Sequence, residues 1–161
     1  MRLQQPTTHE PAGKNRQRWM RAFALGEEAA LEKGLAAFPD CPPYTFLRKP
    51  EAGMVMLEGR AGNSGRRFNF GEMLVTRCAV RMATADGEVS GHAYVAGNRP
   101  RHAEAAAVLD ALMQQPEYAE RLDKDLVAPL LAARELACRE TAAETSATRV
   151  DFFTMARGED T

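Results

Sequence analysis

The sequence predicts a single α+β domain with a largely antiparallel sheet of about five strands, N-terminal helices, and central and C-terminal helices. Its 161 residues, 45% of them hydrophobic and 27% charged, suit one globular domain with its own core. Apolar residues recur first at helical spacing, then alternate as in strands, and then return to helical spacing. This order indicates separate helical and strand regions rather than repeated βα units.

The N-terminal part divides into a lead-in and two short helices. Residues 1–13 are polar and lack periodicity, so we expect a disordered lead-in followed by one domain over residues 14–161. From Asn15 the apolar residues repeat at helical spacing, and a second set does so over Ala30–Phe38. The prolines within Pro39–Pro43 end this region, because proline lacks the N–H that a continuing helix requires.

The middle of the chain has the character of strands. We expect strands over Tyr44–Arg48, Met54–Arg60, Glu72–Ala83 and Glu88–Ala96, and a final strand over Arg149–Met155. Turn-forming residues separate the first four at 50–53, 62–65 and 86–87, where the Asp-Gly pair is typical of a hairpin.

The segment from Glu72 to Ala83 alternates most clearly. One face carries Leu74, Thr76, Cys78, Val80 and Met82, which we expect to lie in the core. The other face carries Arg77 and Arg81, separated by roughly 13 Å at the usual rise of a strand. We expect this second face to meet solvent, a ligand or an acidic partner, so both arginines are candidates for contact with phosphate or with a partner protein.

The remaining helices follow Pro100. The alanine- and leucine-rich segment Ala103–Met113 is helical in character and is broken at Pro116. A further helical region extends over Glu117–Ala143, and we expect it to bend near Pro129.

Composition excludes several classes of protein. Lysine and arginine number 21 against 22 acidic residues, a net charge of -1, so the chain has no overall attraction for nucleic acid or anionic lipid. No apolar run approaches the roughly 20 residues of a membrane-spanning helix, and the N-terminus does not resemble a signal peptide. We therefore expect a cytoplasmic protein that binds neither membrane nor nucleic acid.

The cysteines give no sign of a cofactor. Cys41, Cys78 and Cys138 are far apart and lack CxxC spacing, which argues against a disulfide framework, a zinc site or an iron–sulfur cluster. We expect three reduced thiols, and neither a metal nor a cofactor in this chain. No arrangement of nucleophile, base and orienting group is visible, so no catalytic residue is assigned.

A glycine- and arginine-rich segment is the clearest candidate for an anion site. It begins at Arg60 and includes Arg66 and Arg67 among small residues, which can present guanidinium groups and backbone N–H groups to a phosphate. It is not a P-loop, because it lacks the terminal Lys-Ser/Thr and precedes a strand rather than a helix. The three arginines are candidates for phosphate or partner contact, and a solvated loop is the other interpretation.

Two alternative functions stay open. A small phosphate-ester enzyme would use Arg66, Arg67 and His92, although His92 and His102 are each expected to be structural. A nucleotide- or nucleic-acid-binding module would use the basic segment Lys14–Arg21, which contains Trp19. An amphipathic helix with solvated arginines explains that segment more simply.

The C-terminal segment is a candidate interface. Phe152 and Phe153 are adjacent in a predicted strand, so they point to opposite faces of it. One of them then needs a packing partner outside the main core, which makes both candidates for contact with another protein.

A set of segments distributed over about residues 16–160 resembles the PhnG family, the G subunit of the bacterial carbon–phosphorus lyase core complex. The segments are Arg18-Trp19-Met20, Glu51-Ala-Gly-Met-Val-Met, Arg60-Ala-Gly-Asn-Ser-Gly-Arg-Arg-Phe, Thr76-Arg-Cys-Ala-Val-Arg, Arg101-His-Ala-Glu, Leu109-Asp-Ala-Leu-Met-Gln-Gln and Arg149-Val-Asp-Phe-Phe-Thr-Met-Ala-Arg-Gly-Glu-Asp. The C-terminal segment and the Thr76 segment are the most specific.

The resemblance implies an assembly with H, I and J subunits, of which the I subunit is the expected direct partner. In this assembly phosphonate replaces adenine on ATP to give α-D-ribose 1-methylphosphonate 5-triphosphate, a step assigned mainly to the I subunit. A later radical step with S-adenosylmethionine and an iron–sulfur cluster is assigned to the J subunit. The resemblance carries no catalytic residue over to this chain, so we expect an accessory subunit that is inactive alone.

Overall fold

The computed structural model describes residues 12–61, 65–84 and 87–148. The helices are α1 (Ala12–Leu25), α2 (Glu28–Ala36), α3 (Pro100–Met113), α4 (Pro116–Leu122) and α5 (Ala128–Ala147), and the strands are β1 (Tyr44–Arg60), β2 (Arg67–Thr84) and β3 (Gly87–Ala96). A π-helical turn, η1 (Asp123–Val127), joins α4 to α5. The α+β class and the expected α1 region are thus confirmed, although α1 begins at Ala12 rather than near Lys14.

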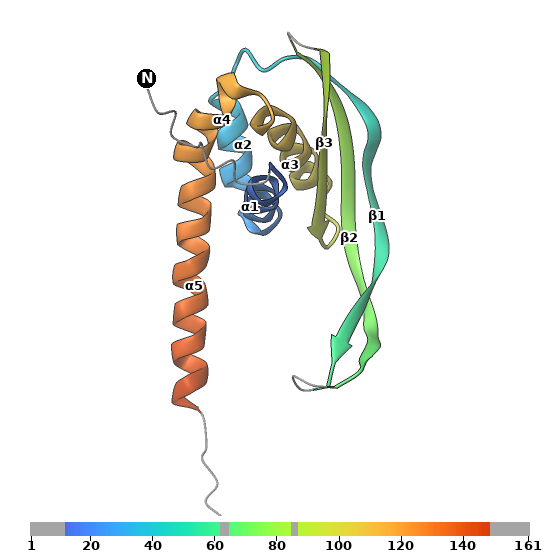
Figure 1. Cartoon of the computed structure of the whole chain (residues 1–161), viewed down its shortest axis with the longest axis vertical. Helices are drawn as coiled ribbons and strands as arrows, with labels where there is room; N and C mark the ends of the chain where they lie inside the picture. Colours follow the sequence, from blue (N-terminus) through green and yellow to red (C-terminus); the bar gives the residue numbers. More distant parts are fainter. Residues whose placement is uncertain (1–11, 62–64, 85–86, 149–161) are drawn as a thin grey trace, which may run out of the picture.

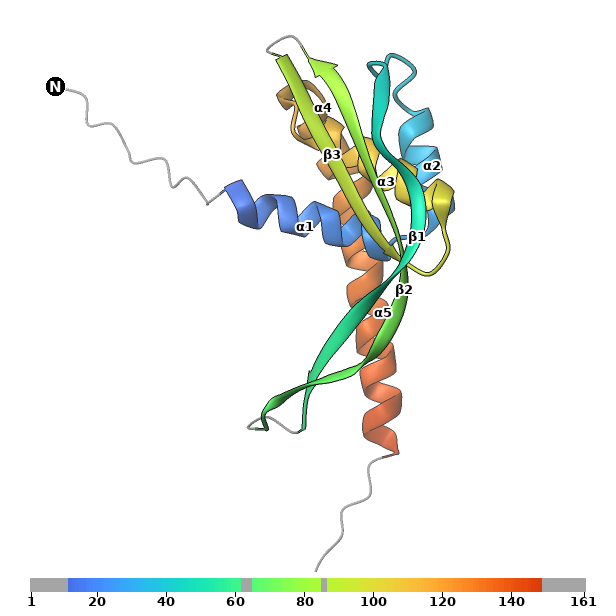
Figure 2. The same ribbon diagram turned by 90° about the vertical axis from the view of Figure 1, so that its right-hand side faces the viewer.

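The helices cover one face of the sheet, here called the inner face (Figure 1). Helix α3 packs directly on β2 and β3, and α1 and α2 pack on α3. The other face, the outer face, is not covered by any described helix (Figure 2). The core therefore lies between the sheet and α3, where the helix contributes a run of buried residues from His102 to Met113 that is interrupted only at Glu104.

The described residues form three antiparallel strands in the order β1-β2-β3, where four of the about five predicted strands were expected, so the predicted number is not supported. The two strands expected over 44–48 and 54–60 are one strand, because Pro50 is absorbed by register shifts between Phe46, Arg48 and Glu51. An edge strand such as β1 tolerates a proline whose missing N–H faces away from the ladder. The predicted strand over 149–155 lies outside the described residues.

Strand β2 begins at Arg67, earlier than the predicted Glu72, and pairs with β1 as far as Arg60 opposite Arg67. The second half of the glycine- and arginine-rich segment, for which a solvated loop is the other interpretation, therefore belongs to the β1–β2 ladder. The sequence pattern alone does not show where β2 begins, since Asn69 and Gly71 are unfavourable in strands. The pairing with β1 shows it.

The inner face of β2 is the predicted core face. Thr76, Cys78, Val80 and Met82 are at most 2% exposed, which confirms the alternation. Leu74 lies on the same face but is 40% exposed, contrary to expectation. The pairing with β3 ends at Val75, and the helix layer does not extend over the sheet beyond this point (Figure 1).

A glycine sets the distance between β3 and α3. A Cβ atom on Gly91 would lie 2.0 Å from the carbonyl oxygen of Ala107 and 2.8 Å from the backbone nitrogen of Ala111. Only the absence of a side chain allows the two backbones to approach this closely. On the other side of α3, the buried His102 lies with Nε2 2.7 Å from the carbonyl oxygen of Phe23 in α1.

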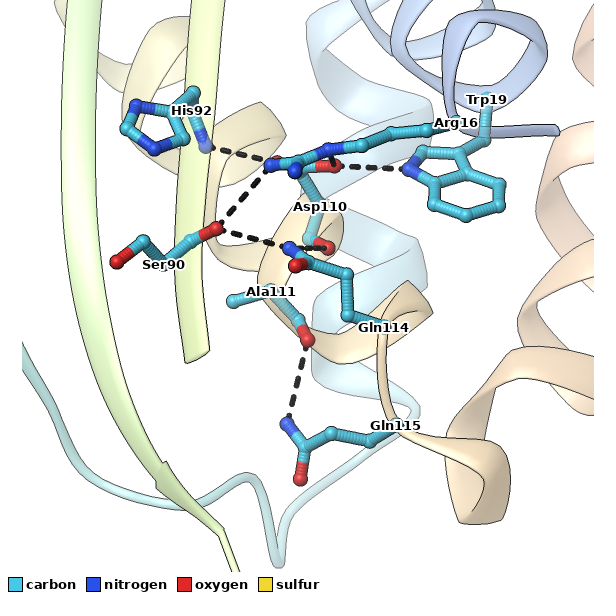
Figure 3. A network of polar contacts seen from close by, with 8 residues as sticks. All are labelled: Arg16, Trp19, Ser90, His92, Asp110, Ala111, Gln114 and Gln115. Atoms are coloured by element: carbon cyan, nitrogen blue, oxygen red, sulfur yellow. Dashed lines mark hydrogen bonds and ion pairs between the residues drawn. The ribbon is translucent and has the colours of Figure 1, made fainter. Parts of the chain in front are cut away.

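A buried carboxylate joins α1, α3 and β3 (Figure 3). Asp110 in α3 is 0% exposed and accepts hydrogen bonds from the Arg16 guanidinium, the nearest at 2.6 Å, from Trp19 Nε1 at 2.9 Å and from the backbone N–H of His92 at 2.9 Å. The expectation that the arginines of α1 are mostly solvated is therefore wrong for Arg16. Arg18 pairs with Asp123, but that pair is exposed.

The predicted bend near Pro129 appears as a change of helix type. The π-helical turn η1 ends one residue before Ala128, and Pro129 occupies the first turn of α5. A proline there has no N–H to complete the α-helical bond to the preceding turn, so the wider π-helical spacing is an understandable local solution.

Candidate subunit interface

The lower part of the β1–β2 ladder extends beyond the rest of the fold as a two-stranded arm, residues 53–60 of β1 and 67–74 of β2 (Figures 1 and 2). Several large apolar side chains of the arm are exposed, namely Met54, Met56, Phe68, Phe70, Met73 and Leu74. Phe70 is 74% exposed, the highest fraction among them. A concentration of exposed apolar groups on one element of a chain of this size is typical of a protein interface.

The two faces of the arm differ. Because Met54 lies opposite Leu74 in the ladder, both project from the inner face, and alternation places Met56 there as well. These three residues form the inner-face patch. On the outer face Phe68 and Phe70 make an edge-to-face contact with ring centroids 6.4 Å apart, next to Gly59.

The tip of the arm is cationic. Arg60 and Arg67 are directly opposed in the ladder, and Arg66 is exposed beside them. Glu58 makes an ion pair with Arg67 at 3.2 Å, between side chains that are 50% and 67% exposed. Like charges placed opposite each other destabilise a ladder, so an acidic group from outside the chain would relieve this arrangement. The structure thus places the three predicted arginines at the tip of the arm, where Arg60 and Arg67 lie at the ends of the two strands and Arg66 immediately precedes β2.

Arg77 and Arg81 lie on the outer face, as alternation predicts, and each has a carboxylate partner within the chain. Arg77 pairs with Glu51 at 2.8 Å and Arg81 with Glu88 at 3.5 Å. Hydrogen bonds from Arg48 and then from Arg77 hold the pKa of the Glu51 carboxyl below its ordinary value. Arg77 and Arg81 therefore each have an acidic neighbour within the chain, and their contact with a partner stays a prediction.

Helix α5 is the second element without packing along most of its length. None of its side chains is buried, and its main contacts are with α1 and η1 near its first turn. Leu130 and Leu131 pack against the core, but Leu136 is 59% exposed. A long helix with so little tertiary packing is marginal in water, which indicates that α5 gains contacts elsewhere.

The residues of the hypothetical phosphate-ester site are not brought together. His92 is exposed on β3 opposite Ala79, and β2 spans about 40 Å between Arg67 and Ala79 at the usual rise per residue. His102 is buried against α1, so it is a packing residue. Among the described residues, no group of three or more His, Cys, Asp or Glu side chains has the arrangement of a metal site.

The cysteines are free thiols in unlike surroundings. Cys41 is partly buried, Cys78 is buried and Cys138 is exposed. Burial raises the pKa of the Cys41 thiol, and burial raises that of Cys78 to about 11. Both are therefore thiols rather than nucleophilic thiolates at neutral pH.

A small cavity of about 360 Å³ lies between α2, α3 and the start of β1, and Cys41 and Tyr44 line it. The Tyr44 hydroxyl donates a hydrogen bond to Glu104 at 2.6 Å. Burial, followed by this carboxylate, raises the pKa of Tyr44 to about 12. The hydrogen bond links β1 to α3 beside the cavity, and the described residues that line the cavity include no nucleophile paired with a base.

Sequence reasoning missed the arm. Met54, Met56 and Leu57 form a run that is apolar on both faces of a strand, which is the one local signal that the strand has no covered face. The predicted interface residues Phe152 and Phe153 lie outside the described residues. None of the helices in the described ranges has the length and hydropathy needed to cross a membrane.

Comparison with known proteins identifies the family. Residues 14–158 match the family described as Phosphonate metabolism protein PhnG. The chain is also 41% identical over 155 residues to the alpha-D-ribose 1-methylphosphonate 5-triphosphate synthase subunit PhnG of Rhizobium meliloti (strain 1021), covering 95% of this chain and 96% of that protein. A match of this extent includes the helices, the sheet and the arm, so the chain belongs to the PhnG family of phosphonate metabolism proteins.

Proposed function

We propose that this chain is a subunit of the carbon–phosphorus lyase core complex and supports formation of α-D-ribose 1-methylphosphonate 5-triphosphate from ATP and phosphonate, with release of adenine. The observation that carries the proposal is the 41% identity to a synthase subunit over 95% of this chain. The exposed arm and the unburied α5 support it, because both are expected of a protein that is part of a larger assembly.

Within the complex we assign this chain an accessory, non-catalytic role. The described residues contain no paired acid and base, no activated thiol and no metal-ligand cluster. The adenine exchange and the later radical cleavage would then belong to other subunits, and this chain would hold no cofactor of its own. The H, I and J subunits are the proposed partners, with the I subunit in direct contact, in the cytoplasm.

The arginines of the arm tip are assigned to contact with a partner. Arg60, Arg66 and Arg67 lie at the end of a projecting element, where a partner surface can reach all three. A phosphate held there would be exposed to water, whereas phosphates that undergo chemistry are normally enclosed. Phe152 and Phe153 stay predicted interface residues.

Reconstitution tests the proposal. The chain is co-expressed with the H, I and J subunits from the same genome, and adenine release from ATP and methylphosphonate is measured with and without it. We expect a complex containing all four chains, loss of activity when this chain is omitted, and none with this chain alone. Full activity of a complex lacking it contradicts the subunit role, and adenine release by the pure chain contradicts the accessory role.

A further inference from the structure

The inner face of the sheet forms core over only part of its length. Cys78 and Val80 are buried beneath the helix layer, whereas Leu74, on the same face of the same strand, is 40% exposed. Met54 and Met56 continue this face on β1 and are 56% and 54% exposed. The surface that packs against helices in one half of the sheet therefore continues into the arm, where no described residue covers it.

Helix α5 presents a second uncovered surface on the same side of the sheet. Its first turn contributes Leu130 and Leu131 to the core, which fixes the side of the helix that faces inward. In the following turns the same side is formed by small or short residues with one arginine, all exposed: Arg134, Ala137, Cys138, Thr141, Ala142 and Thr145. In both views, α5 and the arm extend past the helix layer in the same direction (Figures 1 and 2).

We propose that a helical segment of another subunit of the synthase packs between the arm and α5 and completes the core on the inner face. This inference rests on the proposed function, because it requires the assembled complex. A helix is the element that normally covers the apolar face of a sheet. The short side chains of α5 allow a second helix to approach to the usual interaxial distance of about 8 to 10 Å.

The charges of the arm define the chemistry of this partner segment. Alternation along β1 places Glu58 and Arg60 on the inner face with Met54, and Arg67 lies opposite Arg60. Beyond the inner-face patch two cations therefore lie beside a single carboxylate, Glu58, which pairs with Arg67. The partner helix should carry apolar residues against the patch and acidic residues at the end that reaches the arm tip.

Hydrogen exchange of the whole chain, alone and in the reconstituted complex, tests the inference. In the free chain we expect fast exchange of residues 53–60, 67–74 and 134–147, and in the complex slower exchange of all three segments together. If either the arm or α5 exchanges equally fast in the complex, the inference is wrong. Slow exchange of these segments in the free chain also overturns it, because a second copy or the chain itself would then fill the space.

A paired set of variants tests the same contact by binding. Replacing Met54 and Met56 together by glutamate should weaken association at least about tenfold and leave the melting temperature of the free chain nearly unchanged, since both side chains are more than half exposed. Leu25, 50% exposed at the end of α1, provides the control Leu25→Glu, which should assemble normally. Equal binding by the double variant, or equal loss by the control, contradicts the inference.

The two proposals fail in different ways. If the wild-type chain does not enter the complex, the proposed function is wrong and this inference with it. If the wild-type chain assembles and supports activity while the Met54 and Met56 variant binds as well as wild type, only the inference is wrong.

Discussion

Replacing Asp110 by alanine should lower the free energy of unfolding by about 3 kcal/mol. The substitution leaves Trp19 Nε1 and the backbone N–H of His92 without their acceptor, at about 1 kcal/mol or more each. The charge-assisted bonds from Arg16 add about 1 kcal/mol, at the low end for such bonds, because the arginine side chain is 35% exposed and can be rehydrated.

Thermal and urea unfolding of the isolated chain measure this loss. For a chain of this length, about 3 kcal/mol corresponds to a decrease in melting temperature of about 6 to 12 °C. Asp110→Asn keeps one acceptor oxygen and should cost less. A double-mutant cycle with Arg16→Met should give a coupling energy of about 1 kcal/mol.

The exposed Arg18 and Asp123 pair supplies the matched control. Asp123→Ala removes a carboxylate of which the side chain is 39% exposed, so its effect should stay below about 1 kcal/mol. If Asp110→Ala destabilises the chain no more than Asp123→Ala does, the buried network does not stabilise the packing of α1 on α3 and β3, and the reasoning is refuted.

Three further predictions concern thiols, surface charge and one phenol. Serine at Cys41 and Cys138 should leave phosphonate-dependent growth intact, and loss of growth with folded protein would contradict a purely structural role for these thiols. Replacing both Arg77 and Arg81 by glutamine should change the melting temperature by no more than about 3 °C, since their ion pairs with carboxylates of the chain are exposed. The same variant should reduce the yield of the complex, and an unchanged yield would make both arginines ordinary surface residues. In a spectrophotometric titration the Tyr44 phenol should ionise near pH 12, and this transition should be missing in Tyr44→Phe; ionisation near pH 10 would contradict the prediction. Because the folded pKa of Tyr44 is raised, its contribution to stability is present below pH 10 and is lost as the pH rises toward 12.

The local sequence pattern was sufficient to predict those elements that pack against segments close to them in the sequence. The Asp-Gly pair at 86–87 predicted the β2–β3 hairpin, and Thr84 indeed pairs with Gly87. Period-two alternation correctly predicted that Cys78, Val80 and Met82 are buried, because the strand is regular there and helix α3 packs on it.

Long-range contacts were beyond the reach of such patterns. Arg16 and Asp110 are 94 residues apart, so nothing in the spacing of α1 distinguishes Arg16 from a solvated arginine. Local pattern predicts a turn at Pro50, whereas a proline is tolerated within β1 because β1 is an edge strand, which is a property of the whole sheet. Leu74 was assigned to the core since alternation identifies a face but not the point at which its cover ends.

The close approach at Gly91 has a consequence for the order in which the chain folds. The hairpin of β2 and β3 and the helix that follows form a unit continuous in sequence, residues 75–113, in which backbone meets backbone at Ala107. Contacts between segments close in sequence form with the least loss of chain entropy, so this unit is the expected folding nucleus, with the arm and α5 added later. Gly91→Ala should therefore slow folding more than it speeds unfolding, and the opposite partition in stopped-flow kinetics would place the nucleus elsewhere.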